Sequence, residues 1–284
     1  MLKHLPGRHR QDTHGRRLGP SIDIAGSPLY TTLPYTEPNI AGLSDLVSKY
    51  GHKGAQEVLD LYDQKISGLT VRLTEFDPKM PNKIHFSIRG EDGRDAGTGS
   101  RKFYKYQVDH THLNIYSNYQ GKGFGTEFYR RSEEVYRKLD IRSVTMDAGH
   151  SAGGYVWPLM GFDFANNVAR EEIVEQALQV CYDLGFEINE KEIPEHAYEI
   201  AAMTVAGWRI DEDGIKKTID RRSDPMHVPE DFLDEKGDLL LGKLILMGTS
   251  WMATKYLDDE ESNRVGELYY NHRKKRLAEM EKRA

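Results

Sequence analysis

The stretch Gln120-Gly121-Lys122-Gly123-Phe124-Gly125 decides how the neighbouring sequence folds, because it separates a strand pattern from a helix pattern. Before it, residues 108–116 are predicted to form a strand, because Leu113 and Ile115 alternate with polar neighbours. After it, apolar residues from Phe128 to Leu139 recur at helical spacing. Glycines let backbone N–H groups converge at the start of that helix, where they lack internal partners and the dipole is positive. The stretch therefore predicts a phosphate or pyrophosphate site.

Two other phosphate-binding motifs do not fit this stretch. A Walker loop needs Lys followed by Ser or Thr after its last glycine, and no such pair follows Gly125. A dinucleotide-binding fingerprint needs Gly-x-Gly-x-x-Gly, which the spacing of Gly121, Gly123 and Gly125 breaks. A glycine-rich turn without a ligand is the remaining alternative.

Outward from the stretch, the pattern predicts strands first and helices later. We expect one or two helices over residues 43–66, and strands at 69–73, 83–88 and 141–148, with another beginning at 103–106. The Gly-rich residues 89–100 are expected to form a loop or a hairpin turn. Beyond Phe164, helices are predicted at 170–184, 194–203 and 261–284, whereas residues 239–247 fit either a helix or a strand.

Composition excludes several classes of protein. The chain has 284 residues and a formal net charge of −6, so its overall charge gives no argument for nucleic-acid binding. Its single cysteine, Cys181, excludes an intrachain disulfide. No apolar run reaches the roughly 18 residues that a membrane span needs, and the N-terminus lacks a signal-peptide segment. A cytoplasmic location is expected, with residues 1–26 as a flexible basic tail.

The spacing Gln120-x-x-Gly123-x-Gly125 resembles the Q/R-x-x-G-x-G/A signature of the GNAT superfamily of acyl-CoA-dependent N-acyltransferases. Gly161-Phe162, four residues after Trp157, is similar to the family's closing element before its sixth strand. The resemblance covers about residues 69–164 and implies an α/β (α+β) fold. Its mixed, mostly antiparallel sheet would be flanked by helices. We assign residues 27–167 to this domain and 168–284 to a mainly helical extension packed on it.

The resemblance also implies the donor and the residues that bind it. Acetyl-CoA or another acyl-CoA would be the cosubstrate, and no metal is expected. The backbone of residues 113–116, which include Leu113, Ile115 and Tyr116, would pair with pantetheine. The pyrophosphate would lie on Gln120, Gly121, Lys122, Gly123, Phe124 and Gly125.

Acyl transfer to a primary amine by direct attack would need a base for the amine and an acid for the leaving thiolate. Asp109 is the first candidate for the base, and His110 is expected to share the opposite strand face with His112. The other catalytic candidates are Asp147, His150 and Tyr155. The family's tyrosine acid falls on Trp157, whose indole cannot donate in this way, and its frequent asparagine falls on His150.

The acceptor amine cannot be read from the sequence and could belong to a small molecule or a protein. Neither a nucleic acid nor a membrane is an expected partner, although a homodimer is compatible with the long extension. Two alternatives stay open at this point. The fold could serve as a non-catalytic binding or structural module, or it could use another donor such as aminoacyl-tRNA.

Overall fold

The computed structural model describes residues 40–149, 153–185, 188–205, 208–211, 214–217, 232, 234, 236 and 238–283. The chain divides into two units, Met1–Thr36 and Glu37–Ala284, and all the described residues belong to the second. The predicted tail over residues 1–26 and the candidate residue His150 lie outside the described residues.

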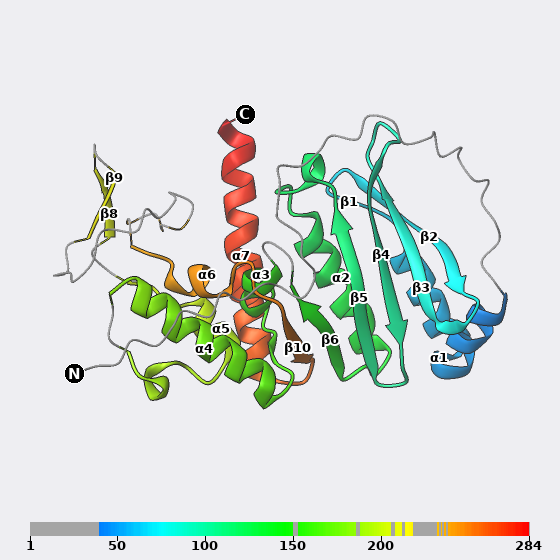
Figure 1. Cartoon of the computed structure of the whole chain (residues 1–284). Coiled ribbons are helices and arrows are strands. Elements are labelled where there is room, and N and C mark those ends of the chain that lie inside the picture. Colours follow the sequence, from blue (N-terminus) through cyan, green and yellow to red (C-terminus); the bar gives the residue numbers. More distant parts are fainter. Residues whose placement is uncertain are drawn as a thin grey trace, which may run out of the picture. The chain divides into compact units, whose positions relative to one another are not determined.

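Eight strands form one sheet in the order β1-β2-β3-β4-β5-β6-β10-β7 (Figure 1). All neighbouring strands are antiparallel except β5 and β6, which are parallel. This confirms the predicted mixed, mostly antiparallel sheet. The strands are β1 (Asp63–Ile66), β2 (Leu69–Asp77), β3 (Met80–Arg89), β4 (Asp95–Phe103), β5 (Gln107–Ile115), β6 (Ser143–Ala148), β7 (Asp163–Phe164) and β10 (Trp251–Tyr256), while β8 (Trp208–Asp211) and β9 (Gly214–Lys217) form a separate pair.

Helices flank the sheet, as predicted, and account for most of the described residues of the extension. They are α1 (Ile40–Leu61), α2 (Phe124–Lys138), α3 (Gly153–Leu159), α4 (Asn167–Asp183), α5 (Ala197–Ala201), α6 (Leu241–Leu246) and α7 (Glu260–Arg283), with the short 3₁₀ helices η1 (Ser117–Tyr119) and η2 (Glu190–Glu192). The ambiguous residues 239–247 thus contain the helix α6. None of the helices in the described ranges combines the length and the apolar character that crossing a membrane requires.

Helices α1 and α2 lie on one face of the sheet and bury its aromatic core (Figure 1). The rings of Tyr62, Phe86 and Phe128 meet there, with centroids 4.9 to 5.9 Å apart. Gly51, at φ 71°, interrupts α1, which agrees with the expectation of one or two helices in this region. A left-handed conformation costs glycine little, because it has no Cβ to clash with the carbonyl.

The strand β4 occupies much of the region for which a loop was predicted. Only the turn before Asp95 is a loop, and Phe103 ends β4 rather than beginning a new strand. A Cβ on Gly99 would lie 2.1 Å from the ring of Phe86, and one on Gly97 would lie 2.2 Å from the carbonyl of Asn114. The glycines that suggested a loop are there because neighbouring groups leave no room for side chains.

The C-terminal extension supplies a central strand, because β10 pairs with β6 on one side and β7 on the other. Three consecutive residues of β10, Ala253, Thr254 and Lys255, are all buried. The segment therefore lacks the apolar and polar alternation that marks a half-buried strand. No pattern predicted this strand, and the extension completes the sheet as well as packing on it.

A buried ion pair fastens β10 to α2 and α7. Lys255 and Glu133 are 1% and 3% exposed, and Nζ lies 2.5 Å from Oε1. Lys255 also donates to the carbonyl of Met160 at 2.8 Å, and the Tyr270 hydroxyl donates to Glu133 Oε2 at 3.4 Å. Burial lowers the pKa of Lys255, and the carboxylate of Glu133 opposes that effect. The pair holds α2 to two elements that come much later in the chain.

Replacing Glu133 with Gln should destabilise the fold by about 3–5 kcal/mol, because Lys255 would keep a buried charge without its partner. Chemical denaturation at pH 7 measures this change. Glu134→Gln on the same helix, where the pair with Arg130 is exposed, should change stability by less than about 1 kcal/mol. Equal losses in the two variants would contradict the role assigned to the buried pair.

Candidate functional site

The parallel strands β5 and β6 separate part-way along their length. Their pairing runs from Gln107 opposite Ser143 to His110 opposite Met146, and then stops. Beyond that point β5 continues to Ile115 against β4, while β6 continues to Ala148 against β10. The backbone of β5 between Thr111 and Ile115 thus has no strand partner on its β6 side.

The backbone of β5 presents two residues to this opening. The N–H of Tyr116 donates to Ala96 on the β4 side, so alternation directs the backbone groups of Leu113 and Ile115 the other way. The side-chain amide of Gln120 donates to the carbonyl of Ile115 at 2.7 Å. Gln120 thereby ties the start of the glycine-rich loop to the end of the strand.

A β-bulge lies where the strands begin to separate. Ser100 pairs with His112 and Lys102 pairs with Asp109, so Arg101 faces two residues of β5 rather than one. The guanidinium of Arg101 is buried, and its Nη1 donates to the carbonyls of His112 at 2.7 Å and Ser100 at 2.9 Å. Arg101 therefore satisfies backbone oxygens at the bulge.

The bulge overturns the expectation that His110 and His112 share a face. One extra residue reverses the alternation of β5, so His110 is buried while His112 is exposed, and Leu113 and Ile115 pack toward the core instead. His110 Nε2 lies 2.9 Å from the Tyr136 hydroxyl. Burial, and then the charge of Arg101, lower the pKa of His110 well below its usual value. His110 is a neutral core residue at neutral pH.

Asp109 and Asp147 are brought to one face of the sheet beside the opening. The Thr145 hydroxyl donates to Asp109, its cross-strand partner, and receives a hydrogen bond of 3.1 Å from Gln107. Asp147 follows Thr145 by two residues, so it lies on the same face, and it accepts a hydrogen bond from Ser250. Two carboxylates therefore approach the point where β5 and β6 separate.

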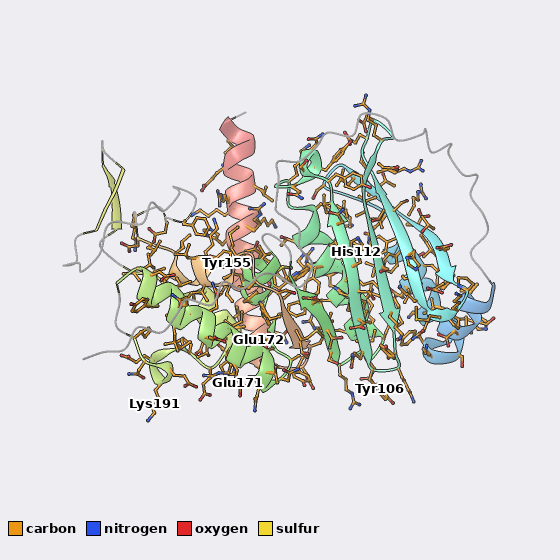
Figure 2. All side chains as sticks on the ribbon, viewed as in Figure 1. Tyr106, His112, Tyr155, Glu171, Glu172 and Lys191 are labelled. Atoms are coloured by element: carbon orange, nitrogen blue, oxygen red, sulfur yellow. The ribbon has the colours of Figure 1, made fainter. Side chains whose placement is uncertain are left out.

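Tyr155 has different surroundings from these carboxylates. Figure 2 shows it on α3, beside α7, whereas His112 lies on β5. Tyr155 lines a groove of about 1520 Å³ between α3, α5, α6 and α7. Burial, and then the neighbouring Tyr269, raise the pKa of its phenol. The nearby Trp157 packs on Tyr129 and Phe162, with ring centroids 5.5 and 5.4 Å away.

The glycine-rich loop has the geometry of an anion site. Gly121 and Gly123 adopt φ of 79° and 82°, and Gly123 begins α2 without a side-chain cap. The first hydrogen bond into α2 runs from Glu127 N–H to the Gly123 carbonyl, so the three preceding amides have no partner within the helix. No atom lies within 4 Å of where a Cβ on Gly125 would be. Lys122 is exposed at the rim.

A contact that sequence reasoning missed joins this loop to α7. Arg273 Nη2 donates to the carbonyl of Gly121 at 2.9 Å. One turn later, Leu277 lies 2.7 Å from where a Cβ on Gly123 would be. The basic run at residues 272–276 was the available signal, but sequence alone does not show which surface a terminal helix covers.

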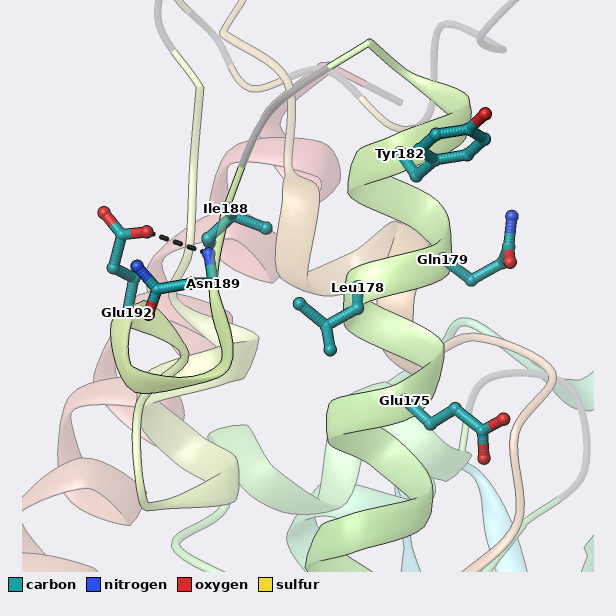
Figure 3. Close-up of a pocket in the computed structure, with 7 residues that line it drawn as sticks. All are labelled: Glu175, Leu178, Gln179, Tyr182, Ile188, Asn189 and Glu192. Atoms are coloured by element: carbon teal, nitrogen blue, oxygen red, sulfur yellow. Dashed lines mark hydrogen bonds between the residues drawn. The ribbon is translucent and has the colours of Figure 1, made fainter. Parts of the chain in front are cut away.

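A second cavity, of about 650 Å³, lies between α4 and the segment leading into η2 (Figure 3). Its residues are Glu175, Leu178, Gln179, Tyr182, Ile188, Asn189 and Glu192. Glu192 accepts a hydrogen bond of 2.9 Å from the Asn189 N–H. None of the residues selected from the sequence lies there. Within the described part of the chain, no three His, Cys, Asp or Glu side chains are placed to hold a metal ion.

Comparison with known proteins finds similar solved structures only. No family model and no curated protein matches the sequence. Three matches are an acetyltransferase from Bacillus cereus, a GNAT family acetyltransferase from Elizabethkingia anophelis with acetyl-CoA bound, and the IAA acetyltransferase from Bacillus cereus. Their identities are 17%, 10% and 13%, and the matches cover 23%, 35% and 34% of this chain and 46%, 78% and 79% of theirs.

The TM-scores of these three matches are 0.21, 0.29 and 0.29. Scores this low do not establish a shared activity, and the chain spans less than half of the first of the three structures.

Substituting His110 tests its placement in the core. Its pKa is lower in the folded protein, so the unfolded chain binds more protons and stability falls as the pH drops below about 6.5. In His110→Gln the loss between pH 6.5 and 5 should be smaller, by up to about 1.4 kcal/mol per pH unit. Chemical denaturation at several pH values measures it, with His52→Gln on the surface as the control. An unchanged slope in His110→Gln would place His110 elsewhere.

Proposed function

We propose that this chain is an N-acyltransferase of the GNAT type, which moves an acyl group from acyl-CoA to a primary amine. The observation that carries the proposal is the separation of the parallel strands β5 and β6 directly before a glycine-rich loop that opens α2. The unpaired backbone edge of β5 therefore leads directly to the anion site at the start of α2. A donor with an amide-bearing arm and a pyrophosphate matches both.

The first turn of α2 offers such a donor backbone amides that have no partner within the helix. The free amides of the first turn of α2 would bind the pyrophosphate, because they point toward one place and lie at the positive end of the helix dipole. Leu113 and Ile115 would pair with the amides of the pantetheine arm through their backbone groups.

Asp109 is the residue that we assign to proton removal from the amine. It lies next to the last paired residues of β5 and β6, so an amine at the strand opening could reach it directly or through one water. The amine then attacks the thioester carbon, the C–S bond breaks, and the acyl group stays on nitrogen. Thr145 donates to Asp109 and fixes the orientation of its carboxylate. Asp147, on the same face, is the second candidate.

We assign no residue as the acid that protonates the leaving thiolate. Burial raises the pKa of Tyr155, which makes its phenol a weaker acid, and its side chain lines the groove beside α7. Trp157, at the position of the family's tyrosine, is held in an aromatic cluster. A thiolate can leave without a strong acid, so the proposed acyl transfer does not require a protein acid, although one would speed it.

Gly125→Glu should abolish acetyl-CoA binding without unfolding the protein. The new carboxylate would enter open space at the start of α2, where a negative charge favours the helix but repels a phosphate. Isothermal titration with acetyl-CoA measures the binding, and thermal unfolding measures the fold.

Gly125→Ala supplies the matched control for this experiment. The methyl group meets no atom within 4 Å, so binding should change little, while α2 should gain up to about 1 kcal/mol of stability. Tight acetyl-CoA binding by Gly125→Glu would show that the donor does not lie on this loop. Failure of the wild type to bind would remove the donor assignment altogether.

Asp109→Asn should lower turnover by at least about 100-fold and leave the affinity for acetyl-CoA nearly unchanged, because it removes a base but no donor contact. Thiol release from acetyl-CoA is measured with a panel of primary amines. Gln107→Ala is the control, because it removes a hydrogen bond to Thr145 on the same face but keeps the carboxylate. Full activity in Asp109→Asn would transfer the role to Asp147.

A further inference from the structure

The groove beside α7 carries an excess of positive charge. Five lysines and arginines line it against three carboxylates. Each of these carboxylates is already engaged: Glu261 pairs with Arg264, Glu199 accepts from the backbone of His196, and Asp234 accepts from the backbone of Lys236 and Asp238. The lining residues of the groove therefore carry two more positive than negative charges.

Arg273 and Arg276 are the two cations at the end of the groove nearest the glycine-rich loop. Both lie on α7 and line the groove, and neither forms an ion pair with a carboxylate in the described part of the chain. Arg273 reaches the loop carbonyl of Gly121 through Nη2, while its Nε is buried without a partner. One guanidinium thus contacts a loop that itself suits phosphate, and a second, about one turn further along α7, lines the same groove.

The rest of the groove suits an aromatic or apolar group. Tyr155 and Tyr269 approach it from α3 and α7, and Val156, Leu159 and Val265 add apolar surface. A ligand that fits the arginine end and the tyrosine-lined part of the groove would carry an anionic group and a planar ring. Both would be joined to a pyrophosphate bound on the loop. The ribose 3′-phosphate and the adenine of CoA have this chemistry, because they lie on the far side of the pyrophosphate from pantetheine.

We propose that the groove binds the 3′-phosphoadenosine end of the donor, with Arg273 and Arg276 on the 3′-phosphate and the tyrosines beside the adenine. This assignment rests on the proposed function and extends it to the C-terminal helix. It predicts that the protein distinguishes CoA from 3′-dephospho-CoA, which lacks only the phosphate that the arginines would bind.

The test compares the affinities of the full-length protein for these two compounds by isothermal titration. Wild type should bind CoA about tenfold or more tightly than 3′-dephospho-CoA, because charge-assisted hydrogen bonds to phosphate would be lost. Arg276→Gln should remove most of that difference by weakening CoA binding alone. Lys274→Gln is the matched control: it removes the same charge from an exposed position about 200° around the helix from Arg276, outside the groove.

The outcomes separate this assignment from the proposed function. If wild type binds CoA and 3′-dephospho-CoA equally well, or if Arg276→Gln retains the full difference, the groove does not hold the 3′-phosphate and only this assignment fails. If wild type binds neither compound, the donor assignment fails as well. An equal loss in Arg276→Gln and Lys274→Gln would show a general charge effect and would also overturn the site.

Discussion

The arrangement of the proposed donor site depends on one extra residue in β5. The bulge opposite Arg101 reverses which side chains face the helices, and beyond it β5 and β6 no longer pair. A buried guanidinium is costly unless its donors are satisfied, and here Nη1 donates to the carbonyls of Ser100 and His112, whereas Nε is buried without a partner. The ring of Phe86, 5.4 Å from its central carbon, adds a cation–π contact. Arg101 thus stabilises the bulged backbone of β5, which departs from a regular strand ladder.

The C-terminal extension takes part in both the core and the site. Its strand β10 continues the sheet beyond β6, and Lys255 on that strand meets Glu133 on the helix that follows the glycine-rich loop. Its last helix then returns to the loop through Arg273. Removing the extension would leave Glu133 buried without its ammonium partner and would expose an edge of β6.

Local patterns predicted the loop and the helix after it, because these depend on neighbouring residues, whereas the class of sheet was implied by the family resemblance. The sequence could not show the bulge, since His110 and His112 obey simple alternation until one residue is inserted. The strand β10 could not be predicted either, because the burial of Lys255 depends on Glu133, which lies 122 positions earlier in the chain. Arg273 was missed for a related reason, because its role depends on the path of the final helix. Each failure concerns a contact between distant parts of the chain.

The bond from Arg273 to Gly121 has a consequence for motion. The same helix carries Tyr270, which donates to buried Glu133, so one face of α7 is anchored in the core while a neighbouring turn holds the loop. Movements of the loop and of this helix are therefore coupled. A molecule that immobilises the loop would also slow the opening of α7, and amide hydrogen exchange along the last helix would report occupancy of a site formed mainly by another segment.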